Sequence, residues 1–267
     1  MNQFFTVKES CEMDKKETLI ELCKELRLPS IRRLIKSSDT FENEEEAYDI
    51  LYQVFTQEKA DRAIRAKQNR IRAANFPQKK VLDELVTEAL PEQARAKLNE
   101  LKSLAFIENG QNIILTGPPG TGKSHMAIGL GMEACLAGYR VFFATVPSFI
   151  NQLKEHRSER TLRSFELKFE KYDLVILDEL GYISFDKEGA ELLFSHLSLR
   201  AGRKSTIITS NLSFINWQDI FHDSVLTAAL TDRLTHKSYV LNMNGNSYRM
   251  RETAEWLKSE SEQVVQN

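Results

Sequence analysis

The chain has 267 residues, which is enough for one large domain or two modest ones and excludes a peptide or a disulfide-stapled miniprotein. Hydrophobic residues make up 42% and charged residues 28%, with a net charge of −2, and no apolar run approaches the roughly 20 residues of a membrane-spanning helix. The amino terminus turns polar too soon for a signal peptide, so a soluble, cytoplasmic protein is expected. The cysteines, Cys11, Cys23 and Cys135, lack metal-ligand spacing, which favours idle thiols over a disulfide or a zinc site.

All eleven glycines lie at Gly110 or later, so the first 109 residues differ in composition from the rest and two domains are expected. The glycine-free part has helical periodicity, with one apolar stripe at Leu19, Leu22, Cys23 and Leu26 and a second beginning at Leu51, Val54 and Phe55. Pro29, Pro77 and Pro91 supply breaks between helices. The sequence therefore predicts a small all-α domain over residues 1–80 and a connector over residues 81–104.

From Gly110 onward, short β-branched runs alternate with amphipathic helical stretches, which is typical of βαβ units in a parallel sheet. The expected strands are Asn112–Thr116, Arg140–Val146, Asp173–Asp178, Ser205–Ser210 and Ser238–Asn242. Too few residues follow Tyr248 for a separate C-terminal lid domain. The fold class predicted for residues 105–267 is thus α/β, with a five-stranded parallel sheet.

The strongest motif follows the first of these strands and matches G-x-x-x-x-G-K-S/T between a strand and a helix. It consists of Gly117, Pro118, Pro119, Gly120, Thr121, Gly122, Lys123 and Ser124. In such a loop the backbone N–H groups and the helix N-terminus hold phosphate oxygens, and the lysine neutralises the β- and γ-phosphates. We expect a nucleotide triphosphate here, with Ser124 as a Mg²⁺ ligand. An ordinary glycine-rich turn is the weaker alternative.

An acidic pair, Asp178 and Glu179, ends the apolar run Leu174–Leu177 at the sheet edge where ligands bind. Asp178 is a candidate to hold Mg²⁺, directly or through water. Glu179 is a candidate to orient the water that attacks the γ-phosphate. A strand-capping acidic pair would be the preferred interpretation in the absence of the phosphate loop.

Two later residues could complete a hydrolytic site. Asn211 follows the strand Ser205–Ser210, where an amide could hold the attacking water or contact the γ-phosphate, although an asparagine there more often starts a turn. Arg233 lies on an expected short helix and could be an arginine finger that acts across a subunit boundary. An ordinary surface ion pair would explain Arg233 equally simply.

Taken together, the stretches GPPGTGKSHMA, YDLVILDELGY, TSNLSF, ALTDRL and GNSYRMRE resemble the IstB-like transposition helper ATPases of the AAA+ class, and more distantly the DnaC helicase loader. The resemblance covers residues 112–252 strongly and extends weakly into the helical part. It implies an AAA+ ATPase in which Asn211 is the sensor and Arg233 the finger. It also suggests Arg249 as a second nucleotide-sensing arginine.

Residues 58–80 carry eight basic residues against Glu58 and Asp61, a net charge of +6 in a chain of net charge −2. The basic residues are Lys59, Arg62, Arg65, Lys67, Arg70, Arg72, Lys79 and Lys80. Such a segment is typical of phosphate binding, although a solvated helix face is common too. The family resemblance favours DNA, and because no base-reading motif is present, duplex binding is expected to be largely independent of sequence.

The leading hypothesis is an ATPase that uses Mg²⁺ and ATP, forms homo-oligomers on duplex DNA with ATP sites between subunits, remodels the DNA and recruits a partner transposase. In this hypothesis ATP hydrolysis drives release. A DnaC-like helicase loader is the alternative. A small-molecule kinase or a nucleotide-binding structural subunit would use the same loop, but Glu179, Asn211 and Arg233 together favour hydrolysis by water.

Overall fold

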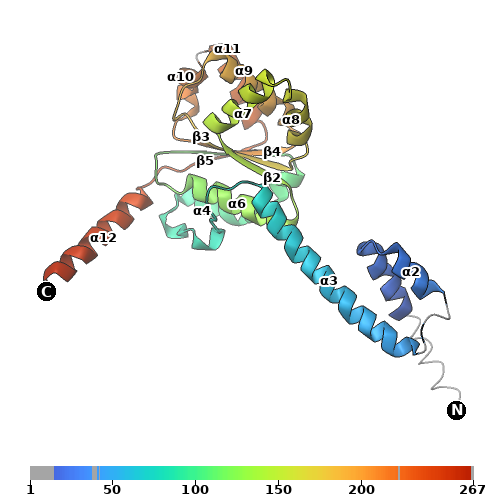
Figure 1. Ribbon diagram of the computed structural model, residues 1–267. Helices are drawn as coiled ribbons and strands as arrows, with labels where there is room; N and C mark the ends of the chain where they lie inside the picture. The colour runs from blue at the N-terminus through green and yellow to red at the C-terminus, as the bar shows by residue number, and fades with distance from the viewer. Residues whose placement is uncertain (1–14, 38–40, 42, 222, 266–267) are drawn as a thin grey trace. The chain divides into compact units, whose positions relative to one another are not determined.

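The computed structural model describes residues 15–37, 41, 43–221 and 223–265 of the chain. Its centre is a five-stranded parallel sheet with the strand order β2-β3-β4-β1-β5 (Figure 1). The strands are β1 (Ile113–Thr116), β2 (Val141–Thr145), β3 (Leu174–Leu180), β4 (Ser205–Ser210) and β5 (Tyr239–Asn242). The predicted α/β class is confirmed, and each predicted strand end lies within two residues of the observed one.

The three central strands are buried on both faces, which explains the apolar runs of β1 and β3, whereas β4 has buried polar residues on both sides of Ile207 and Ile208. Ile113, Ile114 and Leu115 of β1 pair with Ile207, Ile208 and Thr209 of β4 in parallel register. On its other side β4 pairs with β3. The carboxyl ends of β1, β3 and β4 therefore meet at one edge of the sheet, where parallel sheets bind ligands.

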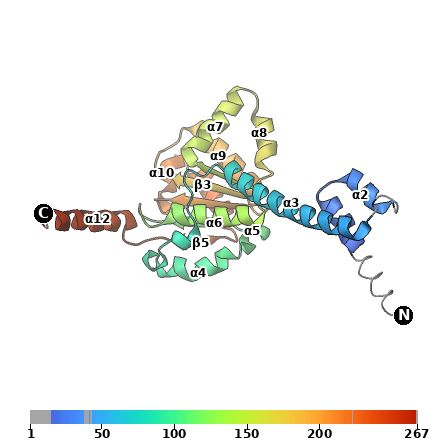
Figure 2. The same ribbon diagram turned by 60° about the horizontal axis from the view of Figure 1, so that its bottom comes forward.

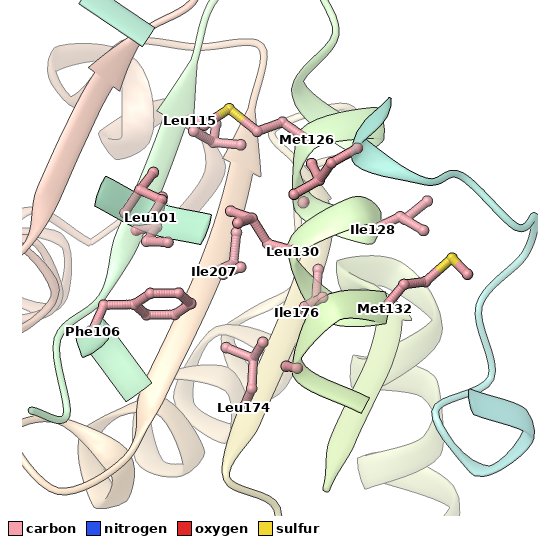
Figure 3. Packing of buried hydrophobic residues seen from close by; sticks show 14 of the residues in the cluster. Leu101, Phe106, Leu115, Met126, Ile128, Leu130, Met132, Leu174, Ile176 and Ile207 are labelled. Carbon is pink, nitrogen blue, oxygen red and sulfur yellow. The ribbon is translucent and has the colours of Figure 1, made fainter. Parts of the chain in front are cut away.

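Helices cover both faces of the sheet in two layers, as Figures 1 and 2 show. One layer contains α4 (Glu92–Lys102), α5 (Ala105–Glu108) and α6 (Lys123–Ala137), whose apolar side chains pack with those of the sheet in Figure 3. The opposite layer contains α7 (Val146–Ser158), α8 (Leu162–Phe169), α9 (Lys187–Arg200), η3 (Phe214–Trp217), α10 (Gln218–Phe221) and α11 (Ser224–Thr235). The last helix described is α12 (Tyr248–Val265).

The chain divides into two compact units, with the division between Gln68 and Asn69. In the first unit, residues 15–25, α2 (Pro29–Lys36) and the first part of α3 (Glu44–Ala73) are helical, which confirms the all-α prediction for the described residues. The predicted stripe from Leu19 to Leu26 is buried together with Tyr48 and Phe55. The prediction for Val54 is wrong, because its side chain is 55% exposed while its neighbour Phe55 faces the core.

Residues 81–104, expected as a connector, contain η1 (Leu82–Glu84), η2 (Thr87–Ala89) and α4 and pack into the second unit. Leu82 and Leu98 are buried in the same core as the sheet. Leu82 lies so close to α6 that a Cβ added at Gly129 would be 2.5 Å from its Cδ2 atom. The apolar residues of this segment are separated by two short 3₁₀ turns, which have no long helical period for a sequence pattern to detect.

Two cysteines are described, and both are buried free thiols, as predicted. Burial raises the pKa of the Cys135 thiol to about 11. Cys11 lies outside the described residues. Among the described residues, no helix combines the length and the apolar composition needed to cross a membrane.

We expect Leu82→Ala to lower the free energy of unfolding by about 2–5 kcal/mol, because it removes a fully buried side chain from a packed core. Urea denaturation measures this change. Leu136→Ala, at a 41% exposed position on α6, is the control and should cost less than about 1 kcal/mol. Equal costs for the two variants would mean that the segment around Leu82 is not an integral part of the domain.

Candidate functional site

The phosphate-loop sequence forms a tight turn between β1 and the first residue of α6. Gly120 and Gly122 have φ values of +83° and +89°, which favour glycine, and the turn brings the N-terminus of α6 to the sheet edge. The ammonium of Lys123 donates hydrogen bonds of 2.7 Å to the carbonyl oxygens of Gly117 and Pro118. A helix N-terminus and a lysine held inside the curve of the loop make a site suited to a polyphosphate.

The charge of Lys123 is held in a partly dry environment, since only 7% of the residue is exposed. Burial lowers the pKa of Lys123, the positive charge of Arg249 lowers it further, and the carboxylate of Asp178 opposes this shift. Two cations and one carboxylate thus act on the same small volume. A phosphate anion would be attracted to this volume, because it would relieve the repulsion between the two cations.

Ser247 and Tyr248, at the start of α12, contact the phosphate loop. The backbone N–H of Tyr248 donates to the carbonyl of Gly120 at 2.9 Å, and a Cβ added at Gly120 would lie 2.1 Å from Oγ of Ser247. Only glycine fits at position 120 in this arrangement. The contact brings the next residue, Arg249, into the wall of the cavity beside the loop.

The carboxylate of Asp178 joins three elements at the sheet edge. Its Oδ1 atom accepts a 2.9 Å hydrogen bond from the Ser124 hydroxyl on α6 and a second hydrogen bond from the Thr209 hydroxyl on β4. Asp178 is buried, so these bonds are shielded from water. A carboxylate next to a serine hydroxyl is a donor set of hard oxygen atoms, which suits Mg²⁺.

Glu179 has an unusual backbone, with φ at +67° in the left-handed region. The pairing of β3 with β4 shifts register between Leu177 and Leu180, so the strand bulges at this point. The N–H of Glu179 donates to Oγ1 of Thr209 at 3.0 Å. The carboxylate of Glu179 is exposed beside the buried Asp178, and both residues line the cavity.

A cavity of about 480 Å³ lies next to the phosphate loop, within the usual size range of small-molecule sites. Its polar wall contains the predicted residues Gly120, Thr121, Gly122, Ser124, Asp178, Glu179 and Arg249. The sequence analysis gave no site role to the other lining residues, which include Pro77, Leu85, Val86, Leu90, His125 and Ile128. One signal for them was the cluster of apolar residues within the acidic stretch before α4.

Asn211 lies close to the acidic pair but is not part of the cavity wall formed by the described residues. Its Oδ1 atom is buried and has no hydrogen-bond partner among those residues. A Cβ added at Gly181 would lie 2.7 Å from this oxygen. Gly181, two residues after Glu179, therefore sets the position of the amide.

Arg233 is exposed on α11, and within the described chain it does not line the cavity. Its Nη1 atom donates to the Ser198 hydroxyl of α9 at 2.7 Å, and its guanidinium lies 4.8 Å from the ring centre of Phe194. These contacts hold Arg233 against the outer side of α9. The structure thus does not bring Arg233 together with the other predicted residues of the same chain.

Several cations of the basic segment already have partners within their own unit. Arg62 donates to the carbonyl of Leu26 at 2.7 Å and pairs with Glu58, which also pairs with Arg65. Lys59 pairs with Glu25 at 2.6 Å. In the second unit, Arg70 donates to the carbonyl of Cys135 at 2.7 Å, near the C-terminal end of α6.

Lys67 and Arg72 differ from these cations, because both are exposed and neither has a hydrogen-bond or ion-pair partner in the described part of the chain. The number of cations available to a ligand is therefore smaller than the net charge of the segment indicates.

A parallel sheet with a phosphate loop after β1 and an acidic pair on β3 defines a P-loop ATPase of the AAA+ class. The AMPPCP-bound DnaA from Aquifex aeolicus has this fold, with a TM-score of 0.53 and 24% identity. The match covers 69% of this chain and 55% of the DnaA chain. The DnaC helicase loader gives a TM-score of 0.50 and 20% identity over 66% of this chain and 99% of that chain. The predicted AAA+ fold is confirmed.

The family described as "IstB-like ATP binding protein" matches residues 21–255, and the chain belongs to this family of ATPases. One relative is the ATP-binding protein of insertion sequence IS5376 from Geobacillus stearothermophilus. It is 36% identical over 89% of this chain and 95% of the relative. The predicted family resemblance is therefore confirmed, and ATP is the nucleotide of the class.

We expect Gly181→Ala to lower ATP turnover by about 10- to 100-fold, because the added Cβ displaces the Asn211 amide from its place beside the acidic pair. Steady-state phosphate release measures this effect. Gly138→Ala is the matched control, since Gly138 has a similar φ of +111° but nothing within 4 Å of an added Cβ. The control should lose stability and keep its turnover, whereas an equal loss in both variants would point to backbone strain alone.

Proposed function

We propose that the cavity is the ATP site, with the triphosphate on Gly117–Ser124 and the base against the apolar wall around Leu85 and Ile128. The observation that carries this proposal is the joining of Ser124, Asp178 and Thr209 by hydrogen bonds beside Lys123. The lining combines polar and charged groups of the phosphate loop and the acidic pair with apolar side chains such as Leu85 and Ile128. This combination suits a molecule with a charged tail and a flat ring.

In this proposal each polar residue has a distinct task. Lys123 neutralises charge on the β- and γ-phosphates, and Ser124 and Asp178 hold Mg²⁺, which when bound supplies further neutralisation of phosphate charge. Glu179 orients and polarises the attacking water, because its carboxylate is exposed in the cavity. Asn211 positions that water with its unpartnered amide oxygen, and Arg249 senses the phosphates from the start of α12.

Arg233 is proposed to act as an arginine finger for a neighbouring subunit. Its exposure on α11, away from the cavity wall of its own chain, is compatible with a role in trans. In this proposal the bond to Ser198 and the contact with Phe194 hold the guanidinium in place until a second subunit arrives. ATP sites between subunits would then couple hydrolysis to assembly.

We further propose that the protein forms oligomers on duplex DNA, remodels it and recruits a partner transposase. Support comes from the basic segment and from a relative that belongs to an insertion sequence, which is 36% identical over most of both chains. The helicase-loader alternative has weaker support, since the likeness to DnaC at 20% identity concerns the fold alone. The exposed, unpaired Lys67 and Arg72 are the best candidates for phosphate contacts.

We expect Lys123→Ala to lose ATP binding, because the phosphates would keep uncompensated charge, and Glu179→Gln to bind ATP but turn it over slowly. A fluorescent ATP analogue and phosphate release measure the two effects. With ATP and duplex DNA, Glu179→Gln should accumulate DNA-bound oligomers and Lys123→Ala should form few. Equal assembly by both variants would contradict the proposal that ATP controls oligomer formation.

The triple variant Arg65→Ala, Lys67→Ala and Arg72→Ala should bind duplex DNA more weakly and with a smaller salt dependence. The slope of log affinity against log salt should fall by up to about 0.9 for each cation that no longer neutralises a phosphate. This variant spares Arg62 and Arg70, whose backbone contacts are structural. Fluorescence anisotropy with several unrelated duplexes measures the change.

The matched control removes the same charge from positions outside the basic segment, as Lys168→Ala, Lys171→Ala and Lys187→Ala, all exposed. It should leave the salt slope unchanged, and both triple variants should keep ATP turnover without DNA. If the control flattened the slope and the first variant did not, the DNA site would lie outside the basic segment.

A further inference from the structure

We infer that Thr209 is a positioning residue for ATP hydrolysis, which fixes the metal-side carboxylate of Asp178 and the backbone of Glu179 through a single hydroxyl group. The inference depends on the roles proposed for these two acids. Thr209 opens the stretch TSNLSF, but the sequence analysis gave a role in that stretch to Asn211 alone. Its side chain lies on β4, two residues before Asn211, and the residue is only 1% exposed.

The direction of both hydrogen bonds follows from the chemistry of the partners. The Asp178 carboxylate can only accept and the backbone N–H of Glu179 can only donate, whereas a hydroxyl has one proton and two lone pairs. The Thr209 hydroxyl therefore donates to Oδ1 of Asp178 and accepts from Glu179. Its hydrogen-bonding capacity is directed at both acidic residues at once.

The bulge in β3 explains why this hydroxyl is needed. Leu177 pairs with Ile208 and Leu180 with Ser210, so Asp178 and Glu179 together oppose the single residue Thr209. Because Glu179 is in the left-handed conformation, its N–H bonds to a side chain instead of a strand carbonyl. Without the hydroxyl, this N–H would lose its partner, and the backbone that carries the glutamate would lose its anchor.

The same hydroxyl sets the rotation of the Asp178 carboxylate. Ser124 and Thr209 both donate to Oδ1, and within the described chain no hydrogen bond uses Oδ2. Oδ2 is thereby kept available for a cation or its bound water. Among the described residues, removal of the Thr209 hydroxyl would leave Ser124 as the only donor to the Asp178 carboxylate, which would then be free to rotate.

The test compares Thr209→Val, which keeps the shape and removes the hydroxyl, with Thr209→Ser, which keeps the hydroxyl. For Thr209→Val we expect kcat to fall about 10- to 100-fold and KM for ATP to change less than about threefold. The Mg²⁺ concentration that gives half of the maximal ATP turnover should rise. Thr209→Ser should restore kcat to within about threefold of the wild-type value. Impaired packing alone would not produce this pattern.

Thr206→Val is the matched control, since it makes the same change on the same strand at a hydroxyl that contacts Arg200 and not the acidic pair. It should leave kcat and KM unchanged. Thermal unfolding verifies that each variant is folded. If the valine variant does not fold, Thr209→Cys replaces it, because a thiol is a weak donor, and the same fall in kcat is expected.

Three results would overturn the inference. The first is a Thr209→Val or Thr209→Cys enzyme with kcat within about threefold of wild type. The second is a serine variant as impaired as the valine variant, which would assign the effect to the methyl group. The third is undiminished ATP turnover in Glu179→Gln, which would overturn the proposed ATP site as well. If Glu179→Gln loses turnover and Thr209→Val does not, the inference about Thr209 fails and the proposed ATP site is retained.

Discussion

The pairing of β4 with both β1 and β3 is the constraint on which the rest of the site depends. Parallel register brings the phosphate loop after β1, the acids of β3 and the hydroxyls of β4 to one edge. β1 and β3 carry apolar runs before their polar carboxyl-terminal residues, and β4 is apolar at its centre, so burial of these residues fixes the register and polar groups meet at the edge. The hydrogen bonds at Asp178 then lock α6, β3 and β4 together.

Much of this edge could be predicted from the sequence, because its signals are local. Two patterns can each be recognised within about a dozen positions. One is a glycine-rich loop between a strand and a helix, and the other is a pair of acids after four apolar residues. The remaining features are not local. The apolar cavity wall, the left-handed backbone of Glu179 and the two bonds of Thr209 arise from contacts between segments far apart in the chain. A sequence pattern does not report such contacts.

Charge was harder to predict than fold, for a related reason. Counting residues treats every cation of the basic segment alike, whereas the structure separates those that cap helices or pair with acids from those that face solvent. Arg70 satisfies a carbonyl near the end of α6 and Arg62 reaches the carbonyl of Leu26. Formal charge therefore gives an upper limit to the electrostatic attraction that a nucleic acid would experience.

The contact between Gly120 and Ser247 has a consequence for exchanging parts between relatives. These positions are far apart in the chain, yet the space at one is defined by the side chain at the other. A chimaera that takes its phosphate loop from one parent and the segment around the start of α12 from another would combine two surfaces that do not fit each other. Residues 117–124 and 245–249 consequently form one transferable module, although 120 residues of other structure separate them.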